Sequence, residues 1–123
     1  MKKFEVKLNT TLTKAETLPY GAAKAGCSFR GVYIIADYKR LVEILGQPNK
    51  LTKEEGDGKT QVEWILSTDK GDRALTIYDW KEYKLNYSQV TSWHVGGNFP
   101  KHQVVEILES LGFENTELEY SEV

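Results

Sequence analysis

Residues 36–48 carry the clearest structural signal in the sequence. Asp37 is a favourable helix N-cap, because its carboxylate accepts hydrogen bonds from unpaired N–H groups of the first turn. Gly46 favours a left-handed cap, and Pro48 cannot continue a helix. Apolar residues between these signals recur at i, i+3, i+4 and i+7, namely Tyr38, Leu41, Val42 and Leu45. The pattern predicts one complete helix with a single buried face.

Strand-like patterns lie on both sides of this helix. Alternation or β-branched and aromatic enrichment predicts strands over 3–9, 29–35, 61–67, 73–80 and 90–95. Gly31, inside the second run, indicates a bulge or a close backbone approach. Asn98 is positioned to cap a second helix that Pro100 begins and Gly112 ends. The last three strands are joined by short loops, which favours an antiparallel meander.

We therefore expect an α+β fold of order β-β-α-β-β-β-α, an antiparallel sheet with two helices packed on one face. A chain of 123 residues predicts a single domain spanning 1–123. Residues 10–27 contain Pro19, Gly21 and Gly26, and are expected to form an irregular connection or a long hairpin loop. The acidic residues 114–123 are expected to be a loosely held tail.

Composition narrows the classes of partner. The net charge of −2 argues against a general nucleic-acid binder, so no direct DNA binding is expected. The single Cys27 excludes an intramolecular disulfide and is typical of a reducing compartment. No apolar run approaches the ~18 residues of a membrane span, and the first residues lack the apolar core of a signal peptide. We expect no membrane association and a location in the cytoplasm.

The densest group of functional candidates lies in residues 78–81 and 93–98. Trp64, Trp80 and Trp93 fall on three adjacent predicted strands, where indole rings either stack on a nucleobase or pack the core. Packing is favoured for Trp64 and Trp93, and the two alternatives are balanced for Trp80. Alternation turns Asp79 inward, which indicates either a functional carboxylate or one that bonds nearby backbone N–H groups; the second is favoured.

Signals for metal binding and catalysis are weak. His94 and His102 lack any partner at metal-ligand spacing, so no metal or other cofactor is expected, and His94 is expected on a strand surface. Gly96 and Gly97 before Asn98 could hold an anion at a helix start or could form a plain turn, the second being favoured. No dinucleotide fingerprint, P-loop or nucleophile pattern is present, which argues against an enzyme.

Three segments in order resemble a family of small phage and prophage proteins: GVYIIADYKRLVEILGQP, QVEWIL with ALTIYDWKEY, and TSWHVGG. The resemblance spans residues 31–97. It is carried by Gly31, Tyr38, Leu41, Val42, Gly46, Pro48, Glu63, Trp64, Thr76, Ile77, Tyr78, Asp79, Trp80, Lys81, Trp93, His94, Gly96 and Gly97. The family resembled is that of the Thoeris anti-defence proteins, which sequester cyclic ADP-ribose-type immune signals without cleaving them.

The resemblance implies a phage-encoded sponge for a cyclic nucleotide, acting in the host cytoplasm as a homo-oligomer with ligand pockets at subunit contacts. Non-destructive binding requires aromatic stacking for the base and cationic or backbone donors for phosphates. The expected base and ribose contacts are Trp80, Trp93, His94 and Asn98. The expected phosphate contacts are Arg30, Arg73, Lys81 and Lys101.

Two alternatives stay open. The chain could be a protein–protein inhibitor of a host defence effector, similar to an anti-CRISPR protein, with its acidic tail mimicking nucleic acid. The carboxylates concerned are Glu114, Glu117, Glu119 and Glu122, and a solvated tail is the simpler explanation for so few charges. A small nucleotide hydrolase is the third hypothesis.

Overall fold

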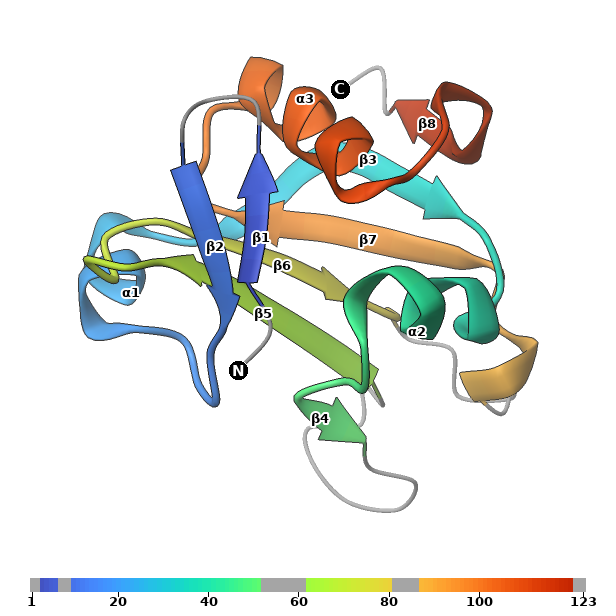
Figure 1. The fold of residues 1–123 in the computed structure, drawn as a ribbon, viewed down its shortest axis with the longest axis horizontal. Coiled ribbons are helices and arrows are strands. Elements are labelled where there is room, and N and C mark those ends of the chain that lie inside the picture. Colours follow the sequence, from blue (N-terminus) through green and yellow to red (C-terminus); the bar gives the residue numbers. More distant parts are fainter. Residues whose placement is uncertain (1–2, 7–9, 52–61, 81–86, 121–123) are drawn as a thin grey trace.

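The computed structural model describes residues 3–6, 10–51, 62–80 and 87–120 (Figure 1). The strands are β1 (Lys3–Val6), β2 (Thr10–Lys14), β3 (Ser28–Ile35), β4 (Lys50–Leu51), β5 (Val62–Thr68), β6 (Ala74–Tyr78), β7 (Ser92–Gly97) and β8 (Leu118–Tyr120). The helices are α1 (Tyr20–Ala25), α2 (Tyr38–Leu45) and α3 (Lys101–Leu111), with short 3₁₀ turns η1 (Tyr87–Gln89) and η2 (Asn115–Glu117).

The described strands form one antiparallel sheet of order β1-β2-β5-β6-β7-β3-β8, with β4 also paired to β5. β5, β6 and β7 make the predicted meander, and the expected antiparallel α+β fold is confirmed. The structure adds β2, α1, β4 and β8 to the expected order. The β1–β2 hairpin brings β1 into contact with α3, which closes the core at that side (Figure 1).

The helix predicted within residues 36–48 is α2. The Asp37 carboxylate accepts a hydrogen bond from the Arg40 N–H at 2.9 Å. Gly46 ends the helix with φ +83°, and its N–H donates to the Val42 carbonyl at 2.9 Å. Leu41 and Leu45 are fully buried. Local sequence therefore determines both ends of α2, and its apolar stripe attaches it to the sheet.

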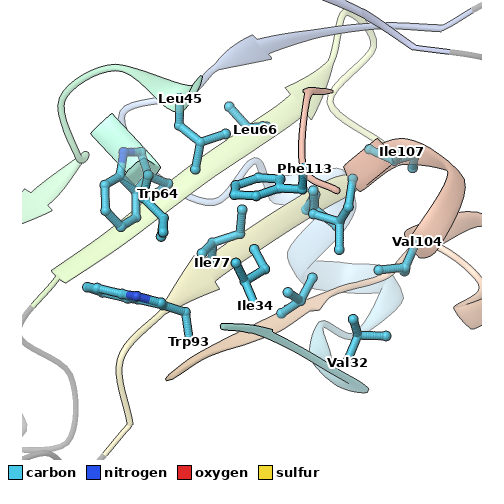
Figure 2. Packing of buried hydrophobic residues seen from close by; sticks show 14 of the residues in the cluster. Val32, Ile34, Leu45, Trp64, Leu66, Ile77, Trp93, Val104, Ile107 and Phe113 are labelled. Atoms are coloured by element: carbon cyan, nitrogen blue, oxygen red, sulfur yellow. The ribbon is translucent and has the colours of Figure 1, made fainter. Parts of the chain in front are cut away.

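The hydrophobic core lies between one face of the sheet and the helices α2 and α3. Figure 2 shows Phe113 at the centre of this layer, with Trp64 and Trp93 toward one end and Val104 and Ile107 toward the other. The two indole rings meet edge to face with centroids 5.6 Å apart. Both are fully buried, as the packing alternative predicted, and each indole N–H donates to a backbone carbonyl.

The expectation of an irregular segment over 10–27 is wrong in two places. Thr10–Lys14 is β2, which pairs with β1 and with the end of β5, and its Leu12 is fully buried. Tyr20–Ala25 is the short helix α1, which lies against the turn after β5. A Cβ on Gly21 would come within 2.9 Å of the Gly71 carbonyl oxygen, so this close approach requires glycine.

The expectation of a loosely held tail is wrong for residues 114–120. β8 pairs with β3 at the edge of the sheet, and Phe113 and Leu118 are buried. Arg40 on α2 donates to both carboxylate oxygens of Glu117 at 3.0 and 3.1 Å, and to the Gly112 carbonyl at 3.2 Å. The ion pair and the strand pairing together attach this segment to the body of the protein.

The predicted capping role of Asn98 is also wrong. α3 begins at Lys101, and its N-cap, Pro100, makes no side-chain capping bond. The Asn98 side chain instead accepts from the Ala74 N–H at 2.8 Å and donates to the Asp72 carbonyl at 2.9 Å. Its amide thus joins the end of β7 to the start of β6.

Candidate functional site

Six side chains form a row across the sheet face that is turned away from α2 and α3. Adjacent residues in this row are direct cross-strand partners: Lys50, Glu63, Tyr78, His94, Tyr33 and Glu119, on β4, β5, β6, β7, β3 and β8. Directly opposed residues share a face of a sheet. The intervening positions, such as Trp64 and Ile77, point into the core. We call the sheet surface on the side away from the core the outer face.

An aromatic cluster occupies the centre of the outer face, and its members are Phe29, Tyr33, Tyr78, Trp80 and His94. The Tyr78 ring stacks on the His94 ring, with centroids 5.6 Å apart and planes 26° from parallel. Tyr33 meets His94 edge to face at 4.9 Å, and Phe29 lies 5.0 Å from His94. Trp80 stands at 77° to Tyr78 and is 38% exposed.

His94 is central to the cluster and is held in its neutral form. Burial lowers the pKa of His94, although the nearby Asp79 charge acts in the opposite direction. Its Nδ1 atom is buried and has no hydrogen-bond partner among the residues described. At neutral pH the imidazole is therefore an aromatic surface, with no positive charge of its own.

Asp79 positions Trp80 on the outer face. The Asp79 side chain is fully buried, and one oxygen accepts from the Val62 N–H at 2.9 Å. This is the backbone-bonding alternative that the sequence favoured. The bond holds the end of β6 against the start of β5, and alternation then turns Tyr78 and Trp80 outward.

A pocket of about 350 Å³ adjoins the cluster. Tyr78 and Trp80 form its aromatic wall, and Lys50 and Glu63 supply its charged groups. Its other lining residues are Leu18, Cys27, Ser28, Thr76 and Gly97. A second pocket of about 340 Å³ shares Leu18, Lys50, Glu63 and Thr76 with it. The two hollows therefore form one groove along the outer face of β5 and β6, which we call the outer groove.

Gly96 leaves β7 without a side chain at the position beside the Tyr78 ring. A Cβ at this position would lie 2.9 Å from Thr76 Oγ1 and 3.2 Å from Tyr78 Cε1. The absence of a side chain lets the Tyr78 ring lie close over β7. Gly96 belongs to the motif quoted above, and its observed role is to make room for a ring.

Arg30 lies at a β-bulge in β3 and is bonded to Ser28, which lines the outer groove. The register of β3 against β7 shifts between Phe29 and Val32, and Gly31 has φ +77°, so the bulge indicated by the sequence is confirmed. Arg30 donates to the Ser28 carbonyl at 3.1 Å and also to the Ser28 hydroxyl. Burial raises the pKa of Cys27, a residue that lines the groove, and the positive charge of Arg30 opposes that rise.

The predicted site residues do not all meet. Trp80 and His94 lie in the aromatic cluster, and Arg30 lies beside the outer groove. Trp93 points into the core, where its indole N–H donates to the Ala36 carbonyl at 2.8 Å.

The remaining predicted residues lie elsewhere. Arg73 donates to the Asn98 carbonyl at 2.5 Å, at the end of β6 away from Trp80. Lys101 is exposed in the first turn of α3, and Lys81 falls outside the described residues.

Sequence reasoning missed Phe29, Tyr33, Lys50 and Glu63 as members of one surface. Alternation in residues 29–35 places Tyr33 opposite the core face, but the partner strands of β3 and β4 have no signature in the sequence. Tyr78 and Trp80 flank Asp79, the residue that alternation was expected to turn inward, and both lie on the outer face.

The chemistry available at the outer face is stacking and charge complementarity. Within the described part of the chain, no three His, Cys, Asp or Glu residues are grouped to hold a metal ion. No helix in that part is long and apolar enough to cross a membrane.

The hypothesis that an acidic tail mimics nucleic acid loses support at Glu117, because Arg40 binds its carboxylate. Glu122 lies outside the described residues.

Comparison of the chain with protein-family models finds no match, and comparisons with curated proteins and with solved structures likewise find none.

Proposed function

We propose that this protein binds a nucleotide in the outer groove and sequesters it without cleaving it. The observation that carries the proposal is the aromatic corner made by Tyr78 and Trp80, which opens onto a pocket lined by Lys50 and Glu63. A flat base, a sugar and an anionic group are the three parts that such a surface recognises.

The corner suits a nucleobase. One face of the Tyr78 ring is covered by His94 from the β7 side, so its other face is turned toward β5 and the pocket. Trp80 stands nearly perpendicular to that face and limits where a base can slide. Stacking of a base on an aromatic side chain contributes ~1–3 kcal/mol. Preformed rings of this kind lose little side-chain entropy on binding.

The phosphate contacts are assigned to Lys50 and Arg30. Lys50 lines both halves of the outer groove, and Arg30 is fixed beside it through Ser28. Charge-assisted bonds from such groups to phosphate are stronger than neutral ones. Pockets for small ligands span ~300–1,000 Å³, so the half lined by Tyr78 suits one nucleoside and the adjoining half leaves room for a second sugar or phosphate.

The resemblance to Thoeris anti-defence proteins supports the finer proposal. In that proposal the ligand is a cyclic ADP-ribose-type immune messenger, and the protein is a phage-encoded homo-oligomer acting in the cytoplasm of the host. Sequestration requires tight binding and release of the ligand unchanged, which the stacking and charged groups of the groove can provide.

The test is a binding panel followed by recovery of the ligand. The protein is mixed with cyclic ADP-ribose isomers, cyclic oligonucleotides and mononucleotides, filtered, denatured and analysed by mass spectrometry. Retention of at least one nucleotide and its recovery with unchanged mass are expected. A cleaved product would support the hydrolase hypothesis instead. If every nucleotide passes the filter unbound, the proposal fails.

A further inference from the structure

Thr76 places a hydroxyl group on the floor of the outer groove. Its side chain lines both halves of the groove, although the residue is only 8% exposed. Among the residues that the structure describes, none forms a hydrogen bond with this hydroxyl. A ligand that fills the groove shields the hydroxyl from water, which costs free energy unless the ligand bonds to it. The hydroxyl therefore marks a place where a polar group of the ligand is needed.

The neighbours of Thr76 explain why its hydroxyl has no partner within the sheet. Its direct cross-strand partners are Ile65 on β5 and Gly96 on β7, which share the outer face with it. The Ile65 side chain has no polar atom, and Gly96 has no side chain at all. Neither neighbour offers a side-chain group that can bond to the hydroxyl, so its hydrogen-bonding capacity is directed to the groove.

Two oxygen atoms border the space above Gly96. The point that a Cβ on Gly96 would take lies 2.9 Å from Thr76 Oγ1 and 3.1 Å from the Ser28 carbonyl oxygen, at the edge of the Tyr78 ring. A carbonyl oxygen only accepts hydrogen bonds, whereas a hydroxyl both donates and accepts. A ligand group that meets both oxygens must therefore be able to donate. A sugar hydroxyl has this property, and an ionised phosphate oxygen does not.

The position of Thr76 along β6 fits the sugar of a stacked nucleotide. Thr76 and Tyr78 are two residues apart on one strand, so they share the outer face and lie ~7 Å apart along it. In a nucleotide the sugar is bonded directly to the base. A base that stacks on Tyr78, in a nucleotide that lies along β6, therefore brings its sugar over Thr76.

We infer that the outer groove recognises a ribose, and that Thr76 bonds to the 2′-hydroxyl of the nucleotide whose base stacks on Tyr78. This inference rests on the proposed function and specifies its ligand class as ribonucleotides. The 2′-hydroxyl is the sugar hydroxyl nearest the base, it both donates and accepts, and it distinguishes ribonucleotides from deoxyribonucleotides. Thr76 is thus the residue that determines which sugar is bound.

Pairs of nucleotides that differ only in 2′-hydroxyl groups test the inference on the unmodified protein. The pairs are AMP and 2′-deoxy-AMP, cyclic di-AMP and its 2′-deoxy analogue, and cyclic ADP-ribose and its 2′-deoxyadenosine analogue. Each further nucleotide retained in the binding panel is compared with its own 2′-deoxy counterpart. Isothermal titration gives the Kd of each ligand. The ribose member should bind about 2- to 12-fold more tightly, the effect of one neutral hydrogen bond.

Two substitutions at one position test the assignment to Thr76. Thr76→Val replaces the hydroxyl with a methyl group and keeps the branched shape. It should weaken binding of the ribose member and bring the ratio within each pair close to one, while the 2′-deoxy members change little. Thr76→Ser retains the hydroxyl and should retain the preference. Thr13→Val, on β2 and outside the lining of the outer groove, is the matched control and should leave every ratio unchanged.

The outcomes separate the inference from the proposed function. If no nucleotide of either kind binds the unmodified protein, the proposed function itself fails. If nucleotides bind and the 2′-deoxy members bind at least as tightly as the ribose members, the inference fails and the proposed function stands. If Thr76→Val weakens both members of a pair equally, Thr76 contacts another part of the nucleotide and its assignment to the sugar is wrong. A preference that survives unchanged in Thr76→Val also overturns that assignment.

Discussion

Tyr78 and His94 are direct partners across β6 and β7, and their rings stack 5.6 Å apart on the sheet face opposite the core. The contact fixes the Tyr78 ring, because a stacked neighbour on one side restricts its rotation. It also explains why His94 is neutral, since burial among rings disfavours the imidazolium. A rigid ring and an uncharged imidazole together make a surface prepared for another flat group.

The first prediction concerns the exposed wall of the corner. Trp80→Ala should weaken binding of any nucleotide retained by the protein by about 5- to 150-fold, because it removes one stacking surface of ~1–3 kcal/mol. Isothermal titration measures the loss. The fold should persist, since Trp80 is 38% exposed and follows the end of β6.

Tyr20→Ala is the control for that substitution. Tyr20 is an aromatic residue that is 81% exposed on α1 and does not line the outer groove. Its removal should leave affinity unchanged. Equal losses in the two variants would show that the aromatic corner has no specific role.

The second prediction is a pH dependence of stability that originates at His94. The folded state lowers the pKa of His94 below its ordinary value near 6.5, so the unfolded chain binds the proton more readily. The stability due to the neutral form is complete above pH 6.5 and is lost as pH falls through the folded-state pKa. Urea titrations at pH 7.5 and pH 5.5 should therefore show a drop, which His94→Gln reduces.

His102→Gln serves as the comparison, because His102 is exposed in α3 and should leave the pH 7.5 to 5.5 difference unchanged. The carboxyl groups whose pKa the fold lowers, Glu117 and Asp72, titrate below this window and do not contribute to it. An identical drop in the His94 variant and the unmodified protein would contradict the assignment.

The third prediction concerns the buried carboxylate. Asp79→Ala removes the acceptor of the Val62 N–H and leaves that donor buried, which should cost about 1–3 kcal/mol of unfolding free energy. Asp79→Asn keeps an acceptor oxygen at the same place and should cost less. Denaturant unfolding measures both. Equal losses in the two variants would mean that the carboxylate's charge, which both substitutions remove, matters more than its bond to Val62.

Much of the core could be predicted from the sequence because the patterns that specify its elements are local. α2 has a side-chain cap, a glycine stop and a full apolar stripe within thirteen residues, and β5 and β6 are joined by a short turn. Each of these features depends on near neighbours. The packing of Trp64 and Trp93 followed from strand alternation once the strands were recognised.

The outer face was harder to predict because it depends on pairing between distant segments. Glu63 lies beside Lys50, Tyr78 beside His94, and His94 beside Tyr33, and none of these contacts has a spacing rule. α1 was missed because six residues with three alanines and a glycine give too short a periodic signal. Asn98 was wrongly predicted to cap a helix because the side chains that cap helices also bond to backbone groups elsewhere. Here its side chain accepts a hydrogen bond from the Ala74 N–H.

The fourth prediction concerns the C-terminal segment, residues 114–123, whose acidic composition predicted a loosely held tail. Deleting residues 114–123 removes β8 from the edge of β3, the buried side chain of Leu118, and the carboxylate bound by Arg40. Burial of one leucine is worth ~1.5–3 kcal/mol, so the deletion should lower the unfolding free energy by at least about 2 kcal/mol. Deletion of residues 121–123 alone is the control and should cost under about 0.5 kcal/mol. Equal stability of the two truncated proteins, measured by urea unfolding, would mean that the docked segment contributes nothing to the fold.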